Sequence, residues 1–115
     1  MKQIETITSQ ARQNFYVISD SGKKIEFKLY FLPTQASWFV DITCETFSAN
    51  GLRVCKLPNI LDKFRNIIDF GVAVYTKDGL DPWRINDFES GYAVLLLLNE
   101  EEKKELSEEL DGKNQ

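Results

Sequence analysis

The chain has 115 residues and a mass of 13.3 kDa, with a formal net charge of −4 and no histidine. This length accommodates one compact domain and is too short for two of ordinary size. The lack of histidine removes the commonest metal ligand and general base, and the negative charge argues against a protein that grips nucleic acid or anionic lipid.

The acidic excess lies at the C-terminal end of the chain. Residues 100–115 contain seven acidic and three basic residues, which leaves eleven of each kind in residues 1–99. We therefore expect a single, electrically balanced β domain over residues 1–99 and an acidic tail over residues 100–115. The tail is expected to be a solvated appendage, helical or disordered, in which Leu106 and Leu110 suit one weak helix.

The sequence predicts neither a targeting signal nor a membrane span. The first residues lack the apolar run of a secretory signal, and the most apolar stretch, 93–98, is far shorter than the ~20 residues that cross a bilayer. We expect a chain that is made and kept in a cytosol, where Cys44 and Cys55 stay reduced.

The clearest predicted element is an early β-hairpin. A β-branched and aromatic run at 14–19 is followed by the turn residues Asp20-Ser21-Gly22, and apolar residues then alternate with polar ones over 25–31. Pro33 is expected to end the second strand, because proline cannot donate a hydrogen bond to a sheet.

A second hairpin is predicted around Asn50-Gly51, a dipeptide that tolerates the positive φ of a tight turn. The run before it, 37–47, alternates apolar and polar side chains. A turn centred on Asn50-Gly51 would pair Cys44 with Leu57. Cys44 and Cys55 would then share a face but lie diagonally, too far apart for a relaxed disulfide unless a bulge changes the register.

The remaining elements are shorter. Residues 61–66 are expected to form one helical turn or a looped excursion, and residues 72–76 a strand. A long polar connection, 77–91, precedes the continuous apolar run 92–98, which predicts a strand buried on both faces, in a central or barrel-closing position. Roughly six or seven short strands with frequent turns indicate an all-β fold, a small antiparallel β-barrel or sandwich.

Candidates for catalytic or metal chemistry are few. Two cysteines without histidine cannot complete a tetrahedral zinc site, and neither has an activating motif, so we expect inert, partly buried thiols. Four carboxylates near the polar connection could do acid/base work across a cleft, but turn capping is the simpler interpretation, and they lack calcium-loop spacing. We expect no enzyme activity, no metal and no cofactor. The carboxylates are Asp78, Asp81, Asp87 and Glu89.

Aromatic residues raise a further question about binding. Trp38 alternates in phase with the apolar residues of its strand, which favours packing in the core. Trp83 lies in the polar connection, where it is either a lid over the barrel end or an exposed anchor for a partner. Tyr16, Tyr30 or Trp38 could stack on an oligonucleotide, but the neutral body has no basic cluster larger than Lys23-Lys24.

Short motifs follow one another in a fixed order over residues 4–98. In chain order they are Ile4 and Ile7, Gln13-x-Phe15, Val17, Gly22, Phe27-x-Leu29, Trp38-Phe39-Val40-Asp41-Ile42, Gly51, Leu57-Pro58, Ile60-Leu61, Asp69-Phe70-Gly71-Val72, Asp81-Pro82-Trp83 through Asp87-Phe88, and Tyr92 to Leu97. Together, their order and spacing resemble the small baseplate plug proteins of contractile-tailed bacteriophages, the group typified in a cyanophage.

This resemblance implies a structural virion protein near the axis of the tail baseplate, made in the cytoplasm of the bacterial host. Its partners would be the baseplate hub, the tube, other tail proteins or further copies of itself, and neither nucleic acid nor a membrane. The alternative is a small cytosolic β-barrel binding module that recognises a peptide or an oligonucleotide. A protein interface is expected at five residues, four of them in the loop 77–91: Trp83, Arg84, Asp87, Phe88 and Tyr16.

Overall fold

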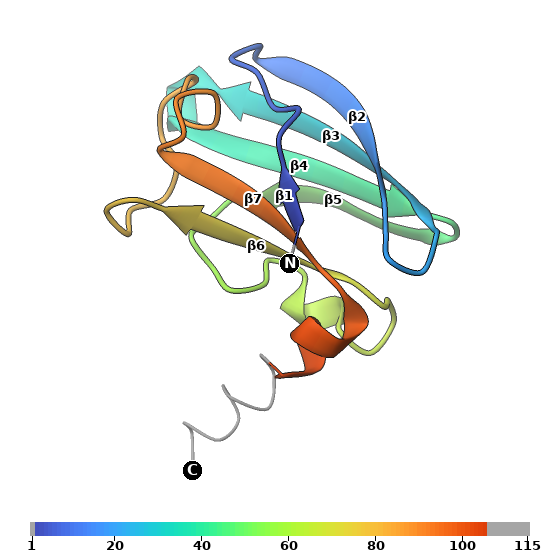
Figure 1. Cartoon of the computed structure of the whole chain (residues 1–115). Coiled ribbons are helices and arrows are strands. Elements are labelled where there is room, and N and C mark those ends of the chain that lie inside the picture. The colour runs from blue at the N-terminus through green and yellow to red at the C-terminus, as the bar shows by residue number, and fades with distance from the viewer. Residues whose placement is uncertain (1, 106–115) are drawn as a thin grey trace.

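The computed structural model describes residues 2–105 of the chain as seven strands in two antiparallel sheets that pack face to face (Figure 1). One sheet has the strand order β2-β3-β4-β5 and the other β1-β7-β6. The prediction of a small all-β fold is confirmed, as an open sandwich and not a closed barrel. The strands are β1 (Lys2–Ile4), β2 (Arg12–Ile18), β3 (Lys24–Leu32), β4 (Ser37–Cys44), β5 (Phe47–Arg53), β6 (Gly71–Thr76) and β7 (Ala93–Leu98).

The predicted first hairpin is confirmed as β2 and β3. The two strands pair from Arg12 opposite Tyr30 to Ile18 opposite Lys24, and a tight turn closes them. Strand β3 ends just before Pro33, which begins a single 3₁₀ turn, η1 (Pro33–Gln35). Proline has no backbone N–H to continue the ladder, so the predicted end of this strand is also confirmed.

The predicted turn at Asn50-Gly51 is wrong. Strands β4 and β5 are joined by a turn that pairs Cys44 with Phe47 and gives Glu45 a φ of 54°. Asn50-Gly51 lies inside β5, where the register shifts opposite Asp41. Gly51 has a φ of 70°, and its N–H donates to Asp41 Oδ1 at 2.7 Å. The positive φ that the dipeptide allows is therefore used for a bulge held by Asp41.

The cysteine prediction changes with this register. Cys44 faces Phe47 and not Leu57, and both Cys44 and Cys55 are free thiols. Burial raises the pKa of each thiol. A thiol with a raised pKa is a poor nucleophile at neutral pH, which agrees with the expectation of inert, partly buried cysteines.

Strand β7 occupies the centre of the three-stranded sheet, as predicted for the apolar run near residue 95. Leu95 and Leu97 face the core, whereas Val94 and Leu96 are only half-buried on the outer face, so burial on both faces is incomplete. The segment 61–66 contains the short 3₁₀ helix η2 (Asp62–Phe64), which confirms the helical turn.

The core lies between the two sheets and is built around large side chains that are almost fully buried, among them Trp38, Phe27 and Phe70. Asn59 closes one edge of it, because its Oδ1 accepts from the N–H groups of Leu61 and Val72 at 3.0 Å each. The polar side chain thereby supplies partners that the neighbouring backbone would otherwise lack.

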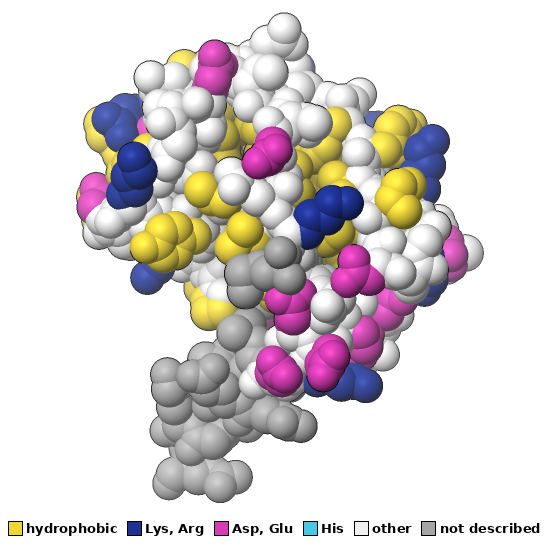
Figure 2. Space-filling view, viewed as in Figure 1, with side chains coloured by type: hydrophobic (Ala, Val, Ile, Leu, Met, Phe, Trp, Pro, Cys, Tyr) yellow, Lys and Arg dark blue, Asp and Glu magenta, His cyan; other side chains and the backbone are white. Residues whose placement is uncertain are grey.

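The beginning of the acidic tail packs on the body. Residues 100–105 are helical, and Lys103 is only 2% exposed. Its Nζ donates to the carbonyl oxygens of Arg65, at 2.6 Å, and Ile68. The prediction that the tail is a solvated appendage is therefore wrong for its first turn. The acidic side chains of this turn lie on the surface shown in Figure 2. Leu106 and Leu110, and the weak helix predicted for them, lie outside the described residues.

Candidate protein-binding site

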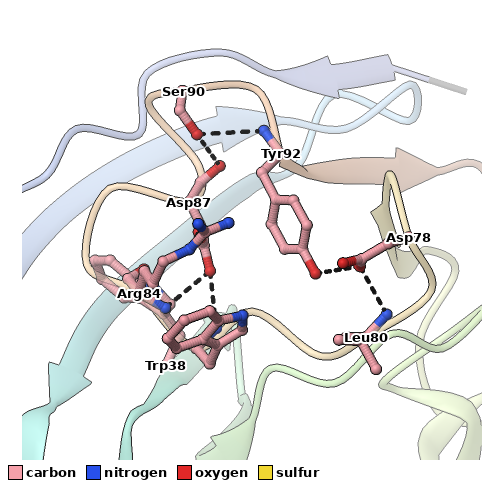
Figure 3. Close-up of polar contacts among 8 residues, drawn as sticks. Trp38, Asp78, Leu80, Arg84, Asp87, Ser90 and Tyr92 are labelled. Atoms are coloured by element: carbon pink, nitrogen blue, oxygen red, sulfur yellow. Dashed lines mark hydrogen bonds and ion pairs between the residues drawn. The ribbon is translucent and has the colours of Figure 1, made fainter.

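The carboxylate of Asp87 organises the loop 77–91, which joins β6 to β7. Asp87 is fully buried, and its Oδ2 accepts from the backbone N–H groups of Trp83 and Arg84 at 2.8 Å each. Its Oδ1 accepts from Arg84 Nε at 2.7 Å (Figure 3). A buried carboxylate is tolerated only when its lone pairs are satisfied, and here three N–H groups do so. The loop is thereby fixed without regular secondary structure.

The guanidinium of Arg84 lies between two aromatic rings. Its Cζ is 4.7 Å from the ring centre of Trp83 and 4.9 Å from that of Tyr92. Each ring face attracts the cation, and the ion pair with Asp87 holds the guanidinium in place. Trp83 is 49% exposed and the Arg84 side chain 45% exposed, so this arrangement stands at the surface.

Two contacts tie the loop to the core. The indole N–H of Trp38, which is fully buried on β4, donates to the carbonyl oxygen of Arg84 at 3.1 Å. Phe88, 8% exposed, packs edge-on against the Trp38 ring with 5.6 Å between ring centres. The prediction that Trp38 belongs to the core is confirmed. Phe88 covers it, which leaves Trp83 as an exposed side chain and not as a lid.

A second carboxylate fixes the other end of the loop. Asp78 accepts from the hydroxyl of Tyr92 and from the backbone N–H of Leu80 (Figure 3). The hydrogen bond to Asp78 favours the protonated phenol and raises the pKa of Tyr92 to about 12. The same bond lowers the pKa of Asp78, because it stabilises the charged carboxylate. Tyr92 is therefore held at one end by Asp78 while its ring covers Arg84.

The carboxylates that the sequence singled out serve separate turns. Asp78, Asp81 and Asp87 each accept a backbone N–H, that of Lys56 at 2.8 Å in the case of Asp81. Glu89 is exposed. Turn capping is thus confirmed for Asp78 and Asp87, whereas Asp81 connects the loop to a segment 25 positions earlier. Within residues 2–105, no group of three or more His, Cys, Asp or Glu side chains is placed to hold a metal ion.

The five residues expected at an interface occupy different environments. Trp83 and Arg84 stand together at the surface, whereas Asp87 and Phe88 are buried beneath them and shape the loop without offering contact area. Tyr16 is 55% exposed but lies on β2, in the other sheet, and belongs to a different surface. The structure therefore brings four of the five residues together: two are exposed for contact and two fix the loop from below.

Three exposed apolar residues close to this loop were missed from the sequence. Leu57, Tyr75 and Leu80 are each between 46% and 59% exposed. Hydrogen bonds connect their segments. The N–H of Val74 donates to the carbonyl oxygen of Leu57 at 2.9 Å, and the N–H of Lys56 donates to the side-chain Oδ1 of Asp81. An isolated leucine such as Leu80 in a polar connection was the available signal, because it has no strand periodicity to bury it.

Comparison with known proteins adds no identification. No family model matches the chain, and no curated protein matches it. Over the part of the chain that the structure describes, no helix is both long and apolar enough to cross a membrane.

Proposed function

We propose that this protein is a structural component of a contractile phage tail, a baseplate plug that packs against hub, tube or other tail subunits. The order of motifs over residues 4–98 is the reason for choosing this assembly. The proposal gives the chain no catalytic role. Its chemistry lies in holding neighbouring subunits in register and in releasing them when the sheath contracts.

The observation that carries the proposal is the rigid display of Trp83 and Arg84. Tryptophan and arginine are enriched among the residues that dominate binding energy at protein interfaces. A side chain that is already ordered loses little conformational entropy when a partner binds. Asp87 fixes the backbone beneath both residues, and the ring centre of Tyr92 lies 4.9 Å from the guanidinium carbon. The loop is therefore organised for contact before any partner arrives.

The surroundings of the loop extend this surface. Of the eight large hydrophobic side chains that are most exposed among the described residues, five belong to the loop, to β6 or to the segment beside β6. Contiguous apolar exposure is typical of protein-interaction sites, and we propose that these five side chains contribute to one such surface. We define the plug surface as these five residues with Arg84: Leu57, Tyr75, Leu80, Trp83, Ile85 and Arg84.

Free strand edges offer a second means of contact. Strands β2 and β5 are the outer strands of the four-stranded sheet. An outer strand presents unpaired backbone groups that can extend the sheet of a neighbour. Such main-chain contacts would hold a neighbouring subunit in register, while Trp83 and Arg84 supply the side-chain contacts.

The test is incorporation into assembled tails. The chain is expressed together with candidate tail, tube and hub proteins from the same genome, and its amount in purified baseplates is measured by quantitative mass spectrometry. Trp83→Ala should reduce incorporation about 10-fold or more, because it truncates a central interface contact, whereas Arg84→Ala would also leave the buried Asp87 carboxylate without its ion-pair partner. Ile67→Ala, which changes a side chain 72% exposed outside the plug surface, is the matched control.

Two outcomes would overturn the proposal. One is equal incorporation of Trp83→Ala and the wild type. The other is a genome in which no tail, tube or hub reading frame lies near the one for this chain.

A further inference from the structure

The outer face of the four-stranded sheet carries a row of four side chains in which two arginines flank two aromatic rings. Arg12, Tyr30, Phe39 and Arg53 lie directly opposite one another on β2, β3, β4 and β5 and so share this face. The Tyr30 and Phe39 rings stack with 5.8 Å between centres, and the Arg12 guanidinium lies 5.8 Å from the Tyr30 ring centre. At ~4.8 Å per strand, the two arginines stand about 14 Å apart, with aromatic rings between them.

A second cation–ring pair lies on the same face, nearer the β2–β3 turn. The Nζ of Lys24 is 3.9 Å from the ring centre of Tyr16, which is 55% exposed. Lys28 stands between this pair and the row, opposite Asn14. The surface between them is hollowed, and its lining includes Arg12, Lys28 and Tyr30 together with the carboxylate of Asp41. We name this surface the cation–ring face and define it by Arg12, Tyr16, Lys24, Lys28, Tyr30, Phe39 and Arg53.

Three of the four cations of this face have no carboxylate partner among the described residues. Arg12, Lys24 and Arg53 form no ion pair with any other residue in the described range 2–105, whereas the other two arginines of the chain, Arg65 and Arg84, are each paired with an aspartate.

The acidic groups nearby already have partners. Asp41 accepts from the N–H of Gly51 and, at 3.5 Å, from the hydroxyl of Tyr30. Glu26 lies 3.8 Å from Lys28 Nζ, and its hydrogen bond with Tyr16 raises the pKa of that phenol. Both carboxylates keep their charge, so this face carries four cations and two anions and has a net formal charge of +2.

We propose that the cation–ring face binds single-stranded nucleic acid. Proteins that bind single strands combine a cationic surface that follows the phosphates with aromatic side chains on which bases stack. Arg12, Lys24 and Arg53 supply the unpaired cations, and Tyr16 is the exposed ring. This site is separate from the plug surface, and its argument does not rest on the proposed role in a phage tail.

An acidic peptide is the rival ligand, because it too would satisfy the cations. The interleaved rings favour nucleic acid: carboxylates need only the arginines, whereas stacked bases make use of the rings as well. The sequence-based expectation of no nucleic-acid partner came from the net charge and the lack of a basic cluster. Folding brings together cations that are far apart in the sequence, such as Arg12 and Arg53, on one face.

The test is the fluorescence anisotropy of a labelled oligo-dT, titrated with the whole chain at several salt concentrations. A probe of about 15 nucleotides matches the length of a typical single-strand site, and NaCl between about 20 and 200 mM covers the range in which counterion release changes affinity. With three to four phosphate contacts, the logarithm of the binding constant should fall against the logarithm of salt concentration with a slope of about −2 to −3. A duplex of equal charge should bind more weakly, because its bases are not free to stack.

Two variants separate the contributions of charge and rings. The double variant Arg12→Ala/Arg53→Ala should weaken binding about 10-fold or more at low salt and make the slope shallower by about 1.4. Tyr16→Leu should weaken binding about 5-fold or more and leave the slope unchanged, since it removes a ring and no charge. Lys63→Ala/Lys77→Ala, which removes two exposed cations outside the cation–ring face, is the matched control and should change neither.

Three results would each overturn the proposal. The first is no change in anisotropy at 20 mM NaCl, at protein concentrations up to about 100 μM, the upper end of ordinary non-specific affinity. The second is an equal loss of binding in the Lys63→Ala/Lys77→Ala control, which would show general charge attraction. The third is displacement of the oligonucleotide by poly-L-glutamate as effectively as by unlabelled oligo-dT, which would assign the face to acidic peptide.

Discussion

The loop 77–91 and the cation–ring face both place an arginine beside aromatic rings, but the charge has a different role in each. In the loop, Arg84 is bound by the buried carboxylate of Asp87 and helps to fix the backbone. On the face, Arg12 and Arg53 have no carboxylate partner among residues 2–105. A charge that is paired within the protein helps to fix the backbone, whereas an unpaired charge at the surface is available to bind a ligand. Removing the first should therefore cost stability, and removing the second should cost binding alone.

The largest effect is expected for Asp87→Ala. The change removes the acceptor for three N–H groups and leaves the backbone donors of Trp83 and Arg84 without a partner beneath the surface. We expect the free energy of unfolding to fall by about 2–4 kcal/mol, measured by urea denaturation. Glu89→Ala, which removes an exposed carboxylate from the same loop, should stay within about 0.5 kcal/mol of the wild type. Equal losses in the two variants would refute the special role of Asp87.

An intermediate effect is expected at the other end of the loop, where Tyr92 meets Asp78. The pKa of Tyr92 is raised to about 12 from an ordinary value of 10.0, so in the unfolded chain this phenol loses its proton at lower pH than in the folded chain. The contribution of this bond to stability is complete below pH 10 and is lost as the pH rises from about 10 to about 12.

Ultraviolet absorbance of the ionised phenol, followed during a pH titration, measures this shift directly. In the wild type, one of the four tyrosines should titrate near pH 12. In Asp78→Asn, that titration should move toward pH 10, because the hydrogen bond to a carboxylate and the charge that opposes ionisation of the phenol are both removed. An unchanged titration in this variant would contradict the assigned cause.

The smallest effect on stability is expected on the cation–ring face. Arg12→Ala/Arg53→Ala removes two exposed cations that form no ion pair among the described residues, so the free energy of unfolding should change by less than about 0.5 kcal/mol. Urea denaturation gives this value on the same sample that is used for oligonucleotide binding. A loss as large as that of Asp87→Ala would remove the distinction between the two regions.

Strand periodicity predicted much of the fold, because alternation of apolar and polar residues directly specifies which face of a strand is buried. It identified the hairpin of β2 and β3 and the strand β6, and it placed Trp38 in the core. The Asn50-Gly51 turn failed for a definite reason. The dipeptide reports only that a positive φ is tolerated, and a bulge held by Asp41 uses the same backbone freedom as a turn.

The candidate sites were less accessible to sequence reasoning. Asp87 and Phe88 were expected at an interface because they lie in a polar loop, but both are buried: Phe88 lies against Trp38, fifty positions earlier in the chain, and Asp87 accepts from backbone groups of its own loop. The cation–ring face was missed because its residues are separated in the sequence and meet only through strand pairing. The spacing of residues along the chain does not show which strands pair. Net charge is a sum over all surfaces and so hides a cationic face on an acidic protein.

The buried ammonium of Lys103 has a practical consequence for where the chain can be cut. The hydrogen bond from Lys103 to the carbonyl oxygen of Arg65 spans 38 positions, so the first turn after β7 belongs to the folded unit. A truncation after residue 99 removes Lys103, so the carbonyl oxygens of Arg65 and Ile68 lose its hydrogen bonds. A truncation after residue 105 keeps Lys103 and both hydrogen bonds. We therefore expect the folded unit to extend at least to Lys103, several residues beyond the last strand.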